Sequence, residues 1–275
     1  MYLVSGASGF LGEALLNRPS PKCHAVRWTG TKFEWLFDGQ RANALNHTDW
    51  TFVHLIGAGR PSKRGTICRT NEHITQRAIE FCLDNDVRKL VYVSGYNVRP
   101  GSGSEYIESK WRCERAIINS GLKYKILRPS YIIGKGDEFC SLERNDGVVE
   151  IVLPRISPEY IFRPLSVQRF WRNALRLIEA GPDHSATHEI VGDPVRIIRF
   201  FELLEQKGRG SIKLKFYDVC ELIYQCMTDD AYYFSLDELA LFLIEELPLK
   251  QDIDKNAESS VNEVIAEYLD GAIEK

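Results

Sequence analysis

Three glycines spaced three residues apart near the N-terminus constrain the fold more than any other feature of the chain. Gly6, Gly9 and Gly12 follow a short run of β-favouring residues and lead into an apolar stretch with helical spacing. A strand, a tight glycine turn and a helix start in this order bring backbone N–H groups and the positive end of the helix dipole together, so a pyrophosphate can bind there. Gly6 and Gly9 let the turn form and the ligand approach, and Gly12 lets helix and strand pack closely. An ordinary turn is the alternative, but the flanking elements favour a dinucleotide site formed by Gly6, Ser8, Gly9, Phe10, Leu11 and Gly12.

Length and composition bound the class of protein. With 275 residues, 44% of them hydrophobic, the chain can bury one large core, or one core and a smaller lobe. The net charge of −3 and the pI near 6.1 give no support for a nucleic-acid partner. The seven cysteines show no CxxC spacing, a strand already begins at Tyr2, and no apolar run reaches membrane-spanning length. We therefore expect a cytoplasmic protein with reduced thiols, no signal peptide, no membrane span and no nucleic-acid partner.

Strand and helix patterns alternate along most of the chain. This alternation predicts right-handed crossovers and an α/β fold, a Rossmann-type doubly wound parallel sheet. We expect residues 1–150 to form the nucleotide-binding domain. Residues 151–275 are expected to form a smaller, mostly helical C-terminal lobe that interweaves with the sheet around residues 160–200. The predicted strands are 23–27, 33–37, 51–56, 89–94 and 187–191, and the first three predicted helices are 10–17, 71–84 and 102–119.

Two segments predict how the adenosine half of a dinucleotide would be held. Arg27 stands about twenty residues after the first glycine, where dinucleotide folds contact the ribose. An acidic residue there would favour the free 2′-hydroxyl of NAD, whereas Arg27, with Lys32 nearby, suits the 2′-phosphate of NADP. A plain surface arginine is the alternative, so NAD stays open. Asp38 is expected near the adenine edge, and small residues after the fourth strand would let the cofactor lie across the strand tips: Gly57, Ala58 and Gly59.

A serine, a tyrosine and a lysine form the catalytic candidates. Ser94 ends the predicted strand 89–94, and open parallel sheets bind ligands at that end. Tyr106 and Lys110 are four residues apart near the start of the next helix, so they share one helix face. A nearby ammonium group favours a phenolate and so suits a tyrosine to proton transfer, while Ser94 could hydrogen-bond the same substrate oxygen. A Tyr/Lys pair on a solvated helix is the alternative, but chance is a poor explanation for all three residues in this order.

With these elements in this order, the chain resembles the short-chain dehydrogenase/reductase superfamily, in its extended and atypical NAD(P)-dependent epimerase/dehydratase branch. The resemblance implies that Tyr106 transfers a proton, that Lys110 binds the nicotinamide ribose, and that Ser94 orients the substrate carbonyl or hydroxyl. It also implies that Pro129 and Ser130 lie beside the nicotinamide. Gly95-Tyr96 stands where family dehydratases carry Asp-Glu, which argues against dehydration. The matching segments are Gly6-x-x-Gly9-x-x-Gly12, 53–57, Asn71, 91–94, Tyr106-x-x-x-Lys110 and 127–134.

The sequence therefore predicts an NADP(H)- or NAD(H)-dependent oxidoreductase or epimerase. Its substrate would be a small molecule with a carbonyl or hydroxyl group, with phosphorylated compounds and nucleotide sugars among the candidates. Two alternatives stay open: a non-catalytic NADP(H)-binding regulatory or accessory protein, and an assembly subunit that docks through its tail. A homodimer also stays open.

The C-terminal tail is strongly acidic. Residues 229–275 carry thirteen acidic and three basic side chains, a net charge of −10, so residues 1–228 carry +7. Two tail helices are predicted from capping-box spacings at Ser235–Glu238 and Ser260–Glu263, and their apolar faces could cover the sheet or a partner. Asp183, His184 and His188 have metal-ligand spacing but lack a fourth partner, so no metal site is expected, and His54 is expected to be a core residue.

Overall fold

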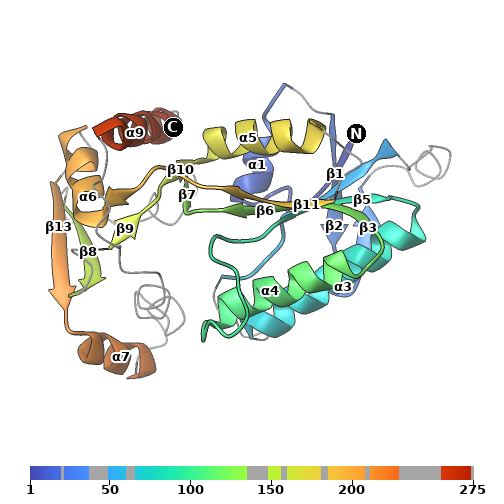
Figure 1. The fold of residues 1–275 in the computed structure, drawn as a ribbon, viewed down its shortest axis with the longest axis horizontal. Coiled ribbons are helices and arrows are strands. Elements are labelled where there is room, and N and C mark those ends of the chain that lie inside the picture. The colour runs from blue at the N-terminus through green and yellow to red at the C-terminus, as the bar shows by residue number, and fades with distance from the viewer. Residues whose placement is uncertain are drawn as a thin grey trace. The chain divides into compact units, whose positions relative to one another are not determined.

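The protein is described from a computed structural model that covers residues 1–19, 22–36, 49–59, 66–134, 148–155, 160–180, 185–207, 211–228 and 255–273. The chain divides into two compact units, whose elements are labelled in Figure 1. The first unit comprises Met1–Gly101, Glu105–Pro129 and Phe170–Ile190, and the second comprises Ser102–Ser104, Ser130–Arg169 and Val191–Lys275.

A seven-stranded sheet forms the centre of the first unit, in the order β11-β6-β5-β4-β1-β2-β3. Every neighbouring pair is parallel except β2 and β3. The strands are β1 (Tyr2–Ser5), β2 (Cys23–Trp28), β3 (Phe33–Trp35), β4 (Thr51–His54), β5 (Lys89–Val93), β6 (Lys123–Pro129) and β11 (Ala186–Ile190). This confirms the predicted α/β fold with a Rossmann-type sheet.

The edge strand β3 departs from the parallel arrangement. Only Thr29–Lys32 separates it from β2, and a parallel crossover needs a dozen residues or more, so the two strands form an antiparallel hairpin. Gly30 adopts φ +97° in this turn, a conformation that glycine takes without strain. The predicted strand 33–37 is therefore present, but as a short antiparallel edge.

Helices cover both faces of the sheet (Figure 1). One face carries α3 (Ile67–Asp84) and α4 (Glu105–Ile118), and the other carries α1 (Phe10–Leu16) and the part of α5 (Val167–Glu179) that belongs to this unit. The core beneath α3 and α4 buries apolar side chains from strands and helices alike. It includes Leu3, Phe52, Leu90, Tyr92, Ile126, Ala78, Cys82 and Ile117. On α5, Ala174 is fully buried and Leu175 is half-buried.

Two helix starts differ from the sequence expectation. Helix α3 begins at Ile67 rather than near Asn71, because Thr66 accepts a hydrogen bond from the Arg69 N–H and caps it. Helix α4 begins at Glu105 rather than at residue 102. The Glu105 carboxylate accepts from the Cys68 N–H in the first turn of α3, at 2.9 Å. The acidic side chain thus contributes to the start of a neighbouring helix.

The second unit holds short strand pairs and three helices among its described residues. The strands pair as β7 (Ile132–Ile133) with β10 (Leu165–Ser166), β9 (Ile161–Phe162) with β12 (Val195–Arg196), and β8 (Val148–Pro154) with β13 (Ser211–Tyr217). The helices are α6 (Ile197–Gln206), α7 (Val219–Thr228) and α9 (Lys255–Ile273).

The C-terminal helix α9 packs its apolar face inside the second unit. Val261, Val264 and Ile265 are buried in a cluster with Phe200 and Phe162. The helix begins five residues before Ser260, so the predicted cap there is wrong. Ser260 instead accepts a 2.6 Å hydrogen bond from Arg169. The other predicted tail helix, near Ser235, lies outside the described residues. Within the described part of the chain, no helix has the length and apolar character needed to cross a membrane.

Candidate functional site

The carboxyl edge of the sheet in the first unit defines the candidate site. In the sheet, β1 lies between β2 and β4. The chain therefore forms β2 on one side of β1 and later crosses over to form β4 on the other side. Ligands of open parallel sheets bind at such a switch point, outside the carboxyl ends of the strands. Here that position holds the glycine turn after β1 and the segment Leu55–Gly59 after β4.

The glycine turn needs two of its three glycines for separate reasons. Gly6 has φ +72°, which L-residues rarely adopt. At Gly12 an added Cβ would lie 2.1 Å from the Gly6 carbonyl oxygen, so the helix contacts the turn itself rather than the strand. At Gly9 the same Cβ would make only an ordinary 3.4 Å contact.

The side chains of this turn leave its outer surface open. Ser8 and Gly9 are exposed, while Phe10 and Leu11 are half-buried. The Leu11 carbonyl accepts a 3.0 Å hydrogen bond from the Trp171 indole N–H, which ties α1 to α5. The predicted contact residues thus form one continuous turn and helix start.

His54 is a core residue, as the sequence predicts. Its Nδ1 lies 2.9 Å from Ser5 Oγ and its Nε2 lies 3.4 Å from Thr75 Oγ1. Burial lowers the pKa of His54 to about 3, and the positive charge of Lys110 adds to the effect. The ring is therefore neutral and locks the end of β4 to β1 and α3.

Asn71 fixes the segment that follows β4. Its Nδ2 donates to the Ala58 carbonyl at 3.1 Å, and its Oδ1 accepts from the Ala58 N–H at 2.6 Å. The same Nδ2 donates to Ser109 Oγ, which donates in turn to the Tyr106 carbonyl. Gly57 and Gly59 stay exposed beside this clamp. The clamp thus joins the predicted cofactor segment to the helix that carries Tyr106.

Tyr106 and Lys110 lie together at this edge, one helical turn apart. The Lys110 Nζ is 5.6 Å from the centre of the Tyr106 ring, and it donates to the Val93 carbonyl at 3.0 Å. A Cβ on Gly57 would come within 3.3 Å of that ammonium group, and a Cβ on Gly95 would come within 3.5 Å of the Tyr106 hydroxyl. Glycine at these two positions therefore lets the backbone lie close to the polar ends of both candidates.

The Lys110 ammonium group is buried between two aromatic rings. The residue is 7% exposed, and its ammonium group lies over the rings of Tyr92 and Tyr106. Within the described ranges, no carboxylate comes within ion-pairing distance of it. A buried cation needs polar partners. The Val93 carbonyl accepts a hydrogen bond from one of the three ammonium protons of Lys110.

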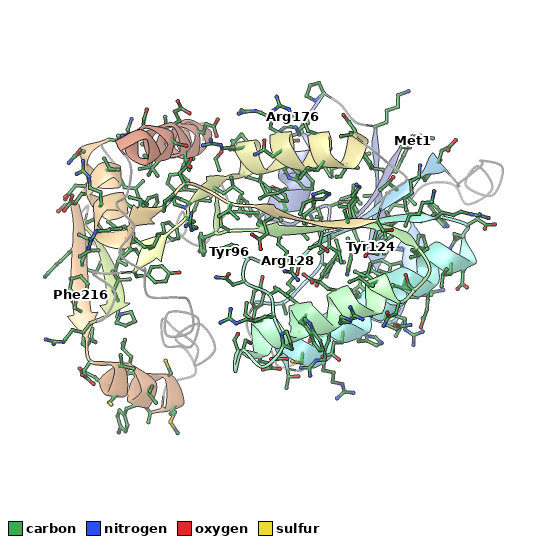
Figure 2. The ribbon with its side chains drawn as sticks, in the orientation of Figure 1. Met1, Tyr96, Tyr124, Arg128, Arg176 and Phe216 are labelled. Atoms are coloured by element: carbon green, nitrogen blue, oxygen red, sulfur yellow. The ribbon has the colours of Figure 1, made fainter. Side chains whose placement is uncertain are left out.

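Ser94 makes a contact that the sequence did not predict. Its hydroxyl donates a 2.6 Å hydrogen bond to Glu114 Oε1. Arg128 donates to both oxygens of the same carboxylate, at 2.9 Å to Oε1 and 2.6 Å to Oε2. Figure 2 labels Arg128 on the sheet side of α4. Because the ionised carboxylate can only accept, the single serine proton is used inside the protein. Towards a ligand, Ser94 could therefore offer only its lone pairs.

Arg27 stands at the carboxyl end of β2. Val26 pairs with Ser5, the last residue of β1, so Arg27 follows at the same edge of the sheet as the glycine turn. Its guanidinium group is 3.4 Å from Glu34 on β3, and Lys32 is 3.2 Å from the same carboxylate. Asp38, the predicted adenine-edge residue, lies outside the described residues.

The remaining predicted residues fall in three places. Pro129 ends β6, and its carbonyl accepts a 2.8 Å hydrogen bond from the Tyr96 N–H. Ser130 belongs to the second unit, where its Oγ accepts from the Gly192 N–H at 2.9 Å. Asp183 and His184 lie outside the described residues, and the described part of the chain contains no group of three or more metal-ligating side chains.

Sequence reasoning missed Asn71 as an anchor and Glu114 as the partner of Ser94. Glu114 follows Tyr106 and Lys110 at the same four-residue spacing, so all three share one face of α4. That spacing could have identified Glu114, whereas its contact with Arg128 depends on the packing of α4 against β6.

The chain shares its fold with solved structures of nucleotide-sugar epimerases and of proteins bound to NADPH or NAD. RMD from Pseudomonas aeruginosa, complexed with NADPH, is 15% identical over 98% of this chain and 99% of its own, with a TM-score of 0.59. A UDP-glucuronic acid 4-epimerase from Bacillus cereus, complexed with NAD, is 16% identical over 79% of this chain and 87% of its own, with a TM-score of 0.61. A nucleoside-diphosphate-sugar epimerase from Staphylococcus aureus is 13% identical over 95% of each chain, with a TM-score of 0.62. No protein-family model matches the sequence, and no curated protein matches it either.

Proposed function

We propose that this protein is an NADP(H)- or NAD(H)-dependent oxidoreductase or epimerase that acts on a carbonyl or hydroxyl substrate. The observation that carries the proposal is the Tyr106–Lys110 pair at the carboxyl edge of the sheet, where glycine at positions 57 and 95 lets the backbone approach the polar ends of both side chains. The fold shared with enzymes solved with NADPH or NAD supports the same choice of cofactor.

The residues at the sheet edge fit a dinucleotide. The turn can form only with glycine at positions 6 and 12, and a glycine turn before a helix is suited to a pyrophosphate. Gly57 and Gly59 offer exposed backbone after β4. The Lys110 ammonium group has protons left to donate, and ribose hydroxyls are suitable acceptors. The proposed contact residues are therefore Gly6, Ser8, Gly9, Phe10, Leu11, Gly12, Arg27, Gly57, Ala58, Gly59, Lys110, Pro129 and Ser130.

In the proposed reaction, a bound nicotinamide would supply hydride transfer. Tyr106 would donate a proton to the substrate oxygen or remove one from it. Lys110 would hold the ribose and place a positive charge near the phenol, while Asn71 would keep the Ala58 segment and the start of α4 in register. Ser94 would accept a hydrogen bond from a hydroxyl form of the substrate, since its own proton is committed to Glu114.

The structural neighbours suggest which substrates to test first. The Bacillus and Staphylococcus proteins are nucleotide-sugar epimerases, so nucleotide sugars are the first compounds to test. We propose that residues 1–150 form the nucleotide-binding domain and that residues 151–275 contribute the substrate lobe.

The Ser94–Glu114 contact favours a second candidate function. A protein that binds NADP(H) without turnover would not need a serine proton in its site, and here that proton is used internally. Such a regulatory or accessory protein would keep the nucleotide contacts and lose only the chemistry.

Nucleotide binding tests the part that both functions share. NADPH and NADH are titrated against wild type and Lys110→Met by fluorescence, with Lys125→Met, which removes a buried lysine from β6, as the control. We expect wild type to bind at least one nucleotide, and only Lys110→Met to weaken it, by about tenfold or more if a charge-assisted contact is lost. Failure of wild type to bind either nucleotide would contradict both functions. Thermal melting of each variant checks that it is folded.

A further inference from the structure

The hairpin formed by β2 and β3 brings three charged side chains to the edge where the ribose of the proposed cofactor would lie. β2 runs parallel to β1, so its carboxyl end and the turn Thr29–Lys32 project from the same edge as the glycine turn. The hairpin is held closed: Thr29 N–H donates to the Lys32 carbonyl at 3.0 Å, and Thr29 Oγ1 donates to the same oxygen at 3.0 Å. The positions of Arg27, Lys32 and Glu34 are therefore set by a well-defined turn.

Glu34 is shared between the two cations. Arg27 pairs with its Oε2 at 3.4 Å and Lys32 with its Oε1 at 3.2 Å. The hydrogen bond from Lys32, followed by that from Arg27, holds the pKa of Glu34 below its usual range, so the carboxylate is charged at neutral pH. The three side chains together carry one positive charge rather than two.

This arrangement affects the two nicotinamide cofactors differently. A 2′-phosphate carries nearly two negative charges and would need both cations, so it would have to displace Glu34 from them and lie near its charge. A free 2′-hydroxyl carries no charge and can donate to a carboxylate. Arg27 alone would favour NADP over NAD, whereas Arg27 paired with Glu34 discriminates less between the two cofactors.

We propose that Glu34 is a specificity-determining residue, which competes with the 2′-phosphate for Arg27 and Lys32 and lets the site accept NAD(H) as well as NADP(H). This inference rests on the proposed function, because it needs a dinucleotide at the switch point. It gives Glu34 a role that the sequence pattern did not assign.

Binding of two small probes tests the inference. Adenosine 2′,5′-bisphosphate and adenosine 5′-monophosphate are titrated by calorimetry at low salt against wild type, Glu34→Gln and Lys32→Gln. We expect Glu34→Gln to tighten the bisphosphate by about two- to fivefold, the range of an exposed ion pair, and to leave the monophosphate unchanged. Lys32→Gln should weaken the bisphosphate by a similar factor. These changes should shrink at about 0.5 M salt, because exposed charges are then screened.

Glu80→Gln is the matched control. Glu80 is also an exposed glutamate that pairs with an arginine, Arg77 at 2.7 Å, but it lies on the last turns of α3. If Glu34→Gln changes bisphosphate binding no more than Glu80→Gln does, while both probes bind wild type, the inference is wrong and the proposed function stands. If neither probe and neither full cofactor binds wild type, the proposed function fails with it.

Discussion

Asn71 and Ala58 form a closed pair of hydrogen bonds, in which one side-chain amide both donates to and accepts from a single peptide unit, at 3.1 and 2.6 Å. Asn71 is 2% exposed, so water cannot replace these bonds easily. The pair links the segment after β4 to α3 and, through Ser109, to α4. The positions of two elements thus depend on the Asn71 side chain: the backbone segment proposed to bind the cofactor, and the helix that carries the proposed catalytic residues.

The first prediction concerns this clamp. Asn71→Ala should lower the free energy of unfolding by about 1–3 kcal/mol, because it leaves the Ala58 peptide without its partners. It should also weaken nucleotide binding, because the segment Gly57–Gly59 loses its anchor. Chemical denaturation and a fluorescence titration measure the two effects. Asn119→Ala, which removes an exposed asparagine after α4, should change neither. Equal behaviour of the two variants would contradict the assigned role of Asn71.

The second prediction concerns the glycine turn. Gly12→Ala places a methyl group 2.1 Å from the Gly6 carbonyl oxygen, so the backbone has to move. We expect a loss of stability of about 1–3 kcal/mol, as for other overpacked sites, and a loss of nucleotide binding. Gly59→Ala meets no atom within 4 Å and should melt like wild type. A Gly12→Ala protein that retains both stability and binding would show that the close approach does not matter.

The order of strands and helices could be predicted from the sequence because apolar periodicity and turn residues act locally. The glycine turn, the boundaries of α1 and the position of His54 follow from that local signal. The antiparallel β3 follows from loop length and could also have been predicted. The helical spacing could have singled out Glu114, but not its contacts with Ser94 and Arg128, because the packing of α4 against β6 brings these residues together. For the same reason the contact of Glu105 with the start of α3 could not be predicted.

The third prediction is a pH dependence of stability. The pKa of His54 falls to about 3 in the folded protein, compared with about 6.5 in an unfolded chain. The folded state therefore binds fewer protons, and His54 contributes its full stability above about pH 6.5. That contribution declines as the pH falls from about 6.5 towards 3, by up to about 1.36 kcal/mol per pH unit.

Urea unfolding at several pH values between these limits measures the slope. His54→Gln keeps a polar side chain that cannot titrate, and its stability should depend less on pH than that of wild type. The quantity compared between the proteins is the pH dependence of the free energy of unfolding, not its value at a single pH. His188→Gln is the comparison variant, because burial and the charge of Lys125 also lower the pKa of His188. It shows how much of the pH dependence comes from a second histidine with a lowered pKa. If the slope for His54→Gln equals that of wild type, His54 does not contribute to the acid sensitivity.

The fourth prediction concerns the buried ion pair. Glu114 is 2% exposed, so Arg128→Leu leaves its carboxylate unpaired and should destabilise the protein by about 3–5 kcal/mol. Adding Glu114→Leu should restore much of this loss, because the unpaired charge is removed. Ser94→Ala removes only one hydrogen bond to a charged group and should cost about 1.5–3 kcal/mol. A double variant less stable than Arg128→Leu alone would show that the pair stabilises the fold in its own right.

Tyr106→Phe tests the central claim, because it removes one hydroxyl and keeps a ring beside Gly95 and Lys110. NADPH and NADH oxidation, and isomerisation of nucleotide sugars, are first screened with wild type to find a turnover reaction. On that substrate, the enzyme assignment predicts that Tyr106→Phe lowers kcat by about 10²–10⁴, the usual contribution of a positioned acid/base group, with nearly unchanged affinity for the nucleotide. Wild-type turnover by Tyr106→Phe on the same substrate would contradict the assignment.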